Sequence, residues 1–475
     1  MAGPDRKDFL AQARQLIGAD HLLSGEGLDG YEKDWRKRYA GRALAVARPG
    51  TTAEVAALLR LCAAHGVSLV PQGGNTGLVG GGVPDGSGQQ LLLSLRRLRQ
   101  IRQVDPANLT LTAEAGCLLA EVQAAASAAG LLFPLSLGAE GSCTLGGNLA
   151  TNAGGTQVLR YGNARELCLG LEVVTPQGEV WQGLCGLRKD NTGYDLRDLF
   201  IGSEGTLGVI TAATVKLYPA PQACMTALAA CPTLDAAVAL LNRARALAGA
   251  TLTGFELISR FCLQLVRRHF PQIPQPLADD AAAPWAVLLE LSDHEDEAHA
   301  RQLLERILGE ALEAGEALDA AVAQSMSQAR QLWHLRESIP LAQSEEGLNI
   351  KHDIALPISA IPAFVADCGA ALQAHCPGVR LVCFGHLGDG NLHFNVQAPE
   401  GQDPAHFLRA QEPAINALVY ERVLQRAGSI SAEHGIGQLK REQLAMTKDP
   451  VALALMRQIK KALDPQGLLN PGRLL

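Results

Sequence analysis

The sequence is short of several features that would define its class. Its 475 residues include eleven cysteines, an odd number, and no two of them form a C-x-x-C pair. A disulfide framework, a zinc ribbon and a cysteine-ligated iron–sulfur cluster are therefore all disfavoured. Scattered free thiols fit a reducing compartment, so the chain is expected in the cytoplasm.

Blocks of like-charged residues and long apolar runs are also scarce. The formal net charge is -7 and there is no block of Lys and Arg, which disfavours a nucleic-acid surface. No apolar run approaches the roughly 18 residues of a membrane span. Residues 1–20 predict an amphipathic helix with neither signal-peptide nor transit-peptide character. A chain of this length predicts a globular protein of two or three domains.

Glycine, in contrast, is clustered in three loop blocks at residues 71–82, 138–155 and 190–210. Successive backbone N–H groups in such loops can form one concave anion site. The first block follows a predicted strand and contains neither the Walker pattern nor G-x-G-x-x-G, so an ordinary NTP or NAD site is disfavoured. A flexible linker is the alternative for that block alone. Together the three blocks predict backbone that lines one long polar ligand.

Hydrophobic patterning predicts α/β alternation in the first half of the chain. The expected strands are 43–47, 67–70, 91–95 and 109–116, and the expected helices are 51–65 and 118–129. A Thr51–Glu54 capping box is predicted at the first of these helices. Beyond residue 219 glycine thins out, and apolar runs such as 285–291 alternate with long helices such as 295–314. The change of composition predicts a second domain.

A hairpin is predicted within CFGHLGDGNLHFNV, residues 383–396. Asp389-Gly390 is a strong signal for a two-residue turn, because glycine accepts the positive φ that the turn requires. With these two residues as the loop, His386 faces His393, and Asn395 follows on the same face. The pair predicts a metal site, with two ordinary hairpin histidines as the alternative.

Longer strings carry a family resemblance. PQGGNTGLVGG, GAEGSCTLGGNLATNAGG, LRYGN, LRKDNTGYDL and LFIGSEGTLGVIT resemble the FAD-binding half of the vanillyl-alcohol oxidase and p-cresol methylhydroxylase superfamily. GHLGDGNLHFN, AEHGIG and LLNPGRLL narrow the resemblance to the FAD-linked D-2-hydroxyglutarate and D-lactate dehydrogenase family, with the 2-hydroxyglutarate branch most similar. The resemblance extends over nearly the whole chain.

The resemblance implies an α+β fold in three parts. Residues 1–219 would form a FAD-binding domain of the p-cresol methylhydroxylase type, built from two α/β subdomains. Residues 220–422 would form a substrate-binding cap, an antiparallel sheet with flanking helices on one face. Residues 423–475 would be a helical segment that returns to the FAD domain.

The same resemblance implies non-covalent FAD, because the glycine blocks contain no histidine that could attach a flavin. The first block would hold the diphosphate, the second would line the ribityl chain and ring, the third would lie near the adenosine, and the C-terminal tail would approach the flavin. The implied residues, in that order, are Gln72, Gly73, Gly74, Asn75, Thr76, Gly77 and Leu78; Gly138, Ser142, Gly147, Asn148 and Gly154; Glu204, Gly208 and Ile210; and Asn470.

The resemblance also implies a metal-assisted oxidation of a D-2-hydroxy acid. His386, His393 and Glu433 would hold a divalent ion, Zn²⁺ being the preferred candidate. His434 would be the general base for the 2-hydroxyl proton. The substrate carboxylates would bind to three residues, which are Arg336, Lys351 and Asn395. Relatives of the metazoan type are expected to carry a hydroxyl residue four positions after the arginine, where this chain has Pro340.

The preferred substrate is D-2-hydroxyglutarate, and the alternatives are D-lactate, D-malate and glycolate, the last through the flavin subunit of a glycolate-oxidising complex. A non-redox metal hydrolase is a further alternative. Electrons would pass to an electron-transfer flavoprotein or a quinone-linked carrier, since the chain has no iron–sulfur motif. A homodimer is among the assemblies left open.

Overall fold

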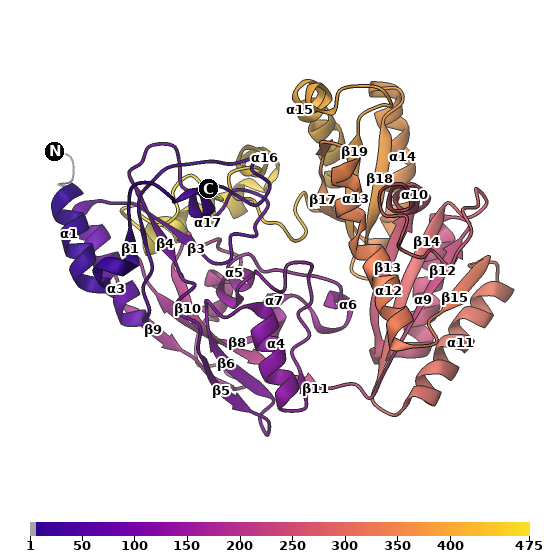
Figure 1. The fold of residues 1–475 in the computed structure, drawn as a ribbon, viewed down its shortest axis with the longest axis horizontal. Coiled ribbons are helices and arrows are strands. Elements are labelled where there is room, and N and C mark those ends of the chain that lie inside the picture. The colour runs from indigo at the N-terminus through magenta and orange to yellow at the C-terminus, as the bar shows by residue number, and fades with distance from the viewer. Residues whose placement is uncertain (1–5) are drawn as a thin grey trace. The chain divides into compact units, whose positions relative to one another are not determined.

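The structure, a computed structural model, describes residues 6–475 and divides the chain into two compact units. Unit 1 comprises the residues up to 154 together with 162–220 and 433–475, and unit 2 comprises 155–161 and 221–432. In Figure 1 unit 1 contains the indigo N-terminal half and the yellow C-terminal helices. The chain first enters unit 2 over residues 155–161, enters it again at residue 221 and leaves it after residue 432, whereas the predicted cap spans residues 220–422.

Unit 1 contains a mainly parallel sheet and an antiparallel sheet. The first has the strand order β1-β2-β4-β3, with β1 antiparallel to β2, and the second has the order β5-β6-β10-β8-β9. A short antiparallel pair joins β7 to β11. The strands are β1 (Leu22–Leu23), β2 (Ala43–Ala47), β3 (Leu69–Gln72), β4 (Gln90–Ser94), β5 (Ile101–Asp105), β6 (Thr110–Glu114), β7 (Leu131–Leu132), β8 (Cys168–Val174), β9 (Val180–Gly183), β10 (Val209–Lys216) and β11 (Tyr218–Pro219). The strands predicted in the first half correspond to β2, β3, β4 and β6.

The helices of unit 1 are mostly short. They are α1 (Arg6–Ile17), α2 (Asp29–Glu32), α3 (Thr52–His65), α4 (Leu119–Ala128), α5 (Leu145–Ala150), α7 (Ala164–Leu167), α8 (Arg197–Phe200), α16 (Arg441–Thr447) and α17 (Pro450–Leu463). At the start of α3, Thr51 Oγ1 accepts the N–H of Glu54 at 3.1 Å, as the capping signal predicts. The Glu54 carboxylate, however, accepts the N–H of Gly50 rather than that of Thr51.

The C-terminal tail pairs with β3 inside unit 1. The Leu69 N–H donates to the Leu468 carbonyl and the Asn470 N–H donates to the Leu69 carbonyl, both at 2.8 Å. Because these bonds extend the β3 edge, Asn470 lies against the strand that leads into the first glycine loop.

Unit 2 contains an eight-stranded antiparallel sheet of order β15-β12-β14-β13-β18-β19-β16, in which β17 also pairs with β19. Its strands are β12 (Ala223–Cys231), β13 (Leu252–Ser259), β14 (Trp285–Asp293), β15 (Asp319–Val322), β16 (Asn349–Ile350), β17 (Asp353–Ala355), β18 (Arg380–His386) and β19 (Asn391–Gln397). Its helices are α6 (Val158–Tyr161), α9 (Leu234–Ala248), α10 (Arg260–His269), α11 (Glu297–Glu313), α12 (Met326–Glu337), α13 (Ile339–Glu345), α14 (Ile361–His375) and α15 (Pro404–Leu424).

Helices cover both faces of this sheet, so the prediction of helices on one face is wrong. On one face of the sheet, the odd-numbered residues of β14, such as Val287, pack against α9, α11, α14 and α15. The other packs even-numbered residues, such as Leu288, against α10, α12 and α13 (Figure 1). Because both sets of alternating side chains are apolar along much of the strands, a cover on one face alone would leave the other exposed.

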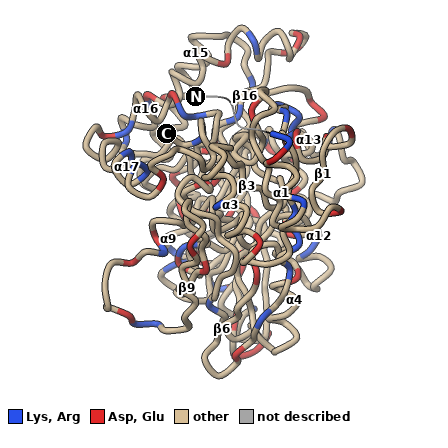
Figure 2. The backbone as a smooth tube through the Cα atoms, turned by 90° about the vertical axis from the view of Figure 1, so that its left-hand side faces the viewer, with Lys and Arg blue, Asp and Glu red and all other residues tan. Residues whose placement is uncertain are grey.

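Charge is mixed along the backbone. Figure 2 shows Lys and Arg interspersed with Asp and Glu along the described chain, in line with the absence of a basic block in the sequence. Among the described residues no helix combines the length and apolarity needed to cross a membrane.

A pH-dependent contribution to stability is expected from Glu290 on β14. Burial raises its pKa, an effect only partly offset by hydrogen bonds from Trp333 Nε1 and Thr226 Oγ1. Above the ordinary carboxyl pKa of about 4.3 the unfolded chain loses this proton while the folded chain retains it. The free energy of unfolding therefore falls as pH rises through the window between the two pKa values.

In Glu290→Gln this contribution is absent. The stability of the variant relative to the parent protein is expected to increase as pH rises from about 4 to about 7. Urea unfolding at several pH values measures the difference. A difference that stays constant across that range would contradict the assignment.

Candidate active site

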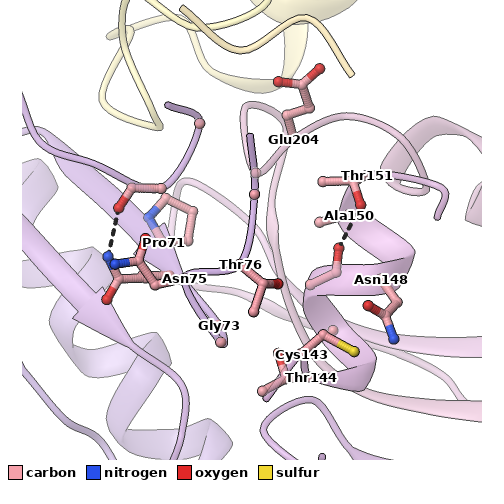
Figure 3. Close-up of a pocket in the computed structure, with 18 of the residues that line it drawn as sticks. Pro71, Gly73, Asn75, Thr76, Cys143, Thr144, Asn148, Ala150, Thr151 and Glu204 are labelled. Carbon is pink, nitrogen blue, oxygen red and sulfur yellow. Dashed lines mark hydrogen bonds between the residues drawn. The ribbon is translucent and has the colours of Figure 1, made fainter. Parts of the chain in front are cut away.

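A cleft in unit 1 is lined by the glycine blocks. It contains about 1040 Å³ of empty space, part of which is open to solvent, and is bounded by residues 71–83, by residues 143–151 around α5, by residues 203–210, and by His434. Figure 3 shows Gly73 and Thr76 of the first loop facing Cys143, Thr144 and Asn148 of the second. The three blocks that are separate in sequence thus form one site.

The first loop presents backbone N–H groups. The guanidinium of Arg96 donates to the carbonyl oxygens of Gly73 and Gly74, at 3.3 and 3.0 Å, and so holds the carbonyl side of the loop. Within residues 6–475 no hydrogen bond accounts for the N–H groups of residues 73–77. Unpaired N–H groups along a loop are the donors that a diphosphate requires.

The two loops approach each other closely enough to require glycine. A Cβ built on Gly74 would overlap the carbonyl oxygen of Ser142, and one built on Gly73 would overlap the hydroxyl of Thr144. Gly77 has open space around it. The requirement therefore applies to particular positions and not to every glycine of the block.

Four buried polar atoms in the lining have no partner within the described chain. They are Asp34 Oδ2, Gln72 Oε1, Thr144 Oγ1 and Asn148 Nδ2. An unsatisfied buried polar group costs about 1–3 kcal/mol, so native sites normally supply a ligand or water for it. A lining that offers both unsatisfied hydrogen-bond donors and unsatisfied acceptors fits a long polar ligand such as FAD.

The cleft contains most, but not all, of the residues that the sequence implied. Those in the lining are Gln72, Gly73, Gly74, Asn75, Thr76, Gly77, Gly147, Asn148, Glu204, Gly208 and Ile210. Those outside the lining are Leu78, Gly138, Ser142, Gly154 and Asn470. Cys143, Thr144, Thr151 and Ser203 line the cleft and were missed, although all four lie inside the glycine-rich strings.

Glu204 holds the segment that follows His434. Its carboxylate accepts the N–H groups of Ile436 and Gly437, each at 2.7 Å. Burial raises the pKa of Glu204, and these two donors and Lys440 act in the opposite direction. Glu204, which the sequence predicts near the adenosine, lines the cleft, and its carboxylate orders the chain next to the predicted base. Asn470 supports this arrangement by donating Nδ2 to the carbonyl oxygens of Gly81 and Glu204.

In unit 2 a cluster of polar side chains lies on the sheet face that carries α12 and α13. Phe384 and Ile258 belong to that face, so His386 and Glu256, two residues away on the same strands, belong to it as well. On β19, Leu392 and Phe394 face the opposite side, which places His393 and Asn395 with the cluster.

The register of the hairpin differs from the prediction. His393 pairs with Phe384, and Val382 pairs with Asn395, because residues 387–390 form a four-residue connection instead of a two-residue turn. The shift is two residues, so the two histidines keep a common face, with ring centroids 5.8 Å apart. Asp389 accepts the N–H of Asn391, as its predicted turn role requires, and burial raises its pKa to about 6.

Glu256 of β13 connects the cluster, and sequence reasoning missed it. It is the direct cross-strand partner of His386 and is fully buried. Oε1 contacts His386 Nδ1 at 2.6 Å, and Oε2 accepts Arg336 Nε at 2.8 Å and Nη2 at 2.7 Å. Burial alone would raise the pKa of Glu256, but His386 and Arg336 outweigh it and hold the pKa at about 2. Glu256 is therefore ionised at neutral pH.

The two histidines fit a metal-binding pair. With its Nδ1–H directed to a carboxylate, His386 has its lone pair on Nε2, the arrangement common in metal-ligating histidines. Asp353, the strand partner of His393, has Oδ1 4.0 Å from His393 Nδ1. The N–H of Ala432, the last residue of unit 2, donates to the Asp353 carbonyl at 3.3 Å.

The predicted substrate-binding residues lie in the same part of unit 2. Asn395 accepts the His352 N–H and donates to Gln343 Oε1, each at 3.0 Å. Lys351 is half-buried in the short segment between β16 and β17, next to His352. Arg336, besides its bonds to Glu256, stacks over the ring of Phe384 at 4.8 Å.

Comparison with known proteins matches each half of the chain to a protein family. Residues 43–183 match the FAD binding domain family, and residues 220–474 match the C-terminal domain of FAD linked oxidases. The chain is 39% identical over 469 residues to the mitochondrial D-2-hydroxyglutarate dehydrogenase of Bos taurus, covering 99% of this chain and 84% of that protein.

A bacterial relative and a solved structure extend the comparison. The D-2-hydroxyglutarate dehydrogenase of Xanthomonas citri pv. viticola is 42% identical over 450 residues, 94% of this chain and 92% of that protein. The crystal structure of p-cresol methylhydroxylase with substrate bound superposes with a TM-score of 0.75 at 17% identity, covering 98% of this chain and 96% of that one. The predicted α+β fold of the p-cresol methylhydroxylase type is confirmed.

Gly74→Ala is expected to weaken FAD binding by about tenfold or more, because its Cβ displaces either the first loop or residue 142. Gly86→Ala, at a position outside the cleft lining, is the control and is expected to keep FAD, since its Cβ meets open space. Flavin absorbance per protein after gel filtration measures both. Equal flavin content in the two variants would contradict the proposed fit of the loops.

Proposed function

The chain belongs to the FAD-linked D-2-hydroxyglutarate dehydrogenase family and is an FAD-dependent 2-hydroxyacid dehydrogenase, and on that premise we propose that its substrate is D-2-hydroxyglutarate and that a divalent metal ion takes part. The observation that carries the metal proposal is the pair of imidazoles on one sheet face, with His386 Nδ1 held by a carboxylate.

The proposed metal ligands are His386, His393 and Glu433. Glu433 follows Ala432 directly, and consecutive Cα atoms are 3.8 Å apart. The Ala432 N–H donates to the carbonyl of Asp353, which is the strand partner of His393, and this supports the next residue as the candidate third ligand. Two imidazoles and one carboxylate suit Zn²⁺ and leave coordination positions for a substrate.

Bound FAD would supply a two-electron hydride acceptor, and a divalent ion held by His386, His393 and Glu433 would lower the pKa of the substrate 2-hydroxyl group. His434 is the proposed base: it lines the FAD cleft and directly follows Glu433. It would take the hydroxyl proton while the C2 hydrogen leaves as hydride, so that a 2-oxo acid is formed.

Arg336, Lys351 and Asn395 are the proposed substrate-binding residues. Only the Nε and Nη2 groups of Arg336 are engaged with Glu256, and a guanidinium has further N–H donors for a carboxylate. Asn395 is held rigidly by His352 and Gln343, as a positioning group requires. The cytoplasmic location and the electron-transfer flavoprotein or quinone-linked acceptor remain predictions from the sequence.

Anaerobic bleaching of the flavin tests substrate and metal together. D-2-hydroxyglutarate is expected to reduce the flavin faster than D-lactate, D-malate or glycolate, and the L-isomers are expected to be inert. Treatment with a chelator is expected to slow reduction, and Zn²⁺ is expected to restore it. Unchanged reduction in a protein shown by metal analysis to be metal-free would contradict the metal proposal.

His434→Ala is expected to lower the rate of flavin reduction by a factor of about 10²–10⁴, the usual contribution of a general base. Flavin and metal content are expected to remain those of the parent protein. His406→Ala, at an exposed position of α15, is the control and is expected to react normally. Stopped-flow absorbance measures the rates, and parental rates in the His434 variant would refute the base assignment.

A further inference from the structure

Glu256 lies at the centre of the polar cluster, and no step of the proposed reaction uses it. Both of its oxygen atoms are occupied, Oε1 by His386 and Oε2 by Arg336. Its exposed fraction is 0%, and it is fixed on the central strand β13 of the eight-stranded sheet. A side chain enclosed in this way cannot contact substrate, so any role must act through its two partners.

Toward His386 the carboxylate selects one tautomer. An ionised carboxylate only accepts hydrogen bonds, so the 2.6 Å contact requires a proton on Nδ1. In the neutral imidazole the lone pair is then on Nε2. Because Glu256 and His386 are direct partners across β13 and β18, the backbone ladder fixes their separation.

Toward Arg336 the carboxylate supplies a counter-charge. The guanidinium is 6% exposed and stacks on Phe384, which is the strand partner of His393. Without Glu256 it would be an unpaired buried cation beside both histidines. Like charges repel strongly at low dielectric, so that cation would oppose the arrival of a second positive charge.

We propose that Glu256 is a positioning residue that prepares the histidine pair for a divalent cation, by holding His386 in the Nδ1–H tautomer and by neutralising Arg336. The inference rests on the proposed metal site and extends it to residues that do not themselves bind the ion. Partners of this kind typically contribute a factor of 10–100 in metal affinity.

Glu290 provides a matched control on the neighbouring strand. It pairs in register with Gly254, two residues from Glu256, and lies on the same sheet face. Within residues 6–475, however, its carboxylate accepts hydrogen bonds only from the neutral groups of Trp333 and Thr226. A glutamine at this position changes a nearby, partly buried carboxylate without changing a partner of any histidine or arginine.

The test is Zn²⁺ titration of chelator-treated, FAD-bound protein carrying Glu256→Gln, Glu256→Leu or Glu290→Gln. Glu256→Gln keeps an oxygen acceptor for His386 and loses the charge, so Zn²⁺ binding is expected to weaken about tenfold. Glu256→Leu loses both and is expected to weaken binding about 100-fold. Glu290→Gln is expected to bind Zn²⁺ as the parent does. Unchanged circular dichroism establishes that each variant is folded.

Nitrogen NMR of labelled histidine reads the tautomer independently of metal and of turnover. The Nδ1–H form of His386 is expected in the parent and in Glu290→Gln, and its loss is expected in Glu256→Leu. Should the leucine variant not fold, Glu256→Gln carries the affinity test by itself. Zn²⁺ affinity within twofold of the parent in the glutamine variant overturns the proposal.

Different results refute the proposed metal site and the positioning role of Glu256. A parent protein that takes up no Zn²⁺ refutes the proposed metal site, and the tautomer then decides the role of Glu256. A parent that binds Zn²⁺ beside variants that bind it equally well leaves the metal site standing and refutes the positioning role.

Discussion

The period-two alternation of side chains in the eight-stranded sheet is the constraint on which the polar cluster depends. It places Glu256, His386, His393 and Asn395 on one face, and the apolar residues between them on the other. Because helices cover both faces, a one-residue slip would move charged groups into one apolar core and apolar groups into the polar cluster. The register is thus fixed by the burial of both faces, and the positions of the histidines follow from it.

The same constraint explains why the two histidines share a face although the predicted register is wrong. The turn signal at Asp389-Gly390 predicts a two-residue loop, but the structure closes the hairpin with residues 387–390. The resulting offset is even, and an even offset preserves the face of every side chain. The glycine loops were predictable for a different reason: their strings are local, and each contains both the residues that approach one another and those that line the cleft.

The partners that hold the site were not predictable in this way, because they meet only in the folded chain. Glu256 is 130 positions from His386, and Glu204 is more than 230 from the backbone groups that it binds. The sequence offered one weak signal, a single carboxylate in the apolar strand TGFELIS. The two-faced cover of the sheet was missed similarly, since periodicity shows which residues are apolar but not which helices pack on them.

Two buried carboxylates, Glu204 and Glu256, and the partly buried Glu290 show how the hydrogen-bond partner decides the role of a carboxylate. Glu290 has only neutral donors, and burial raises its pKa, so it contributes a pH-dependent cost. Glu204 has two backbone N–H groups and orders the chain beside His434. Glu256 alone of the three has both an arginine and a histidine, which keep it ionised. An ionised carboxylate inside a protein fixes protons and charges around it, and Glu256 fixes the Nδ1 proton of His386 and balances the charge of Arg336.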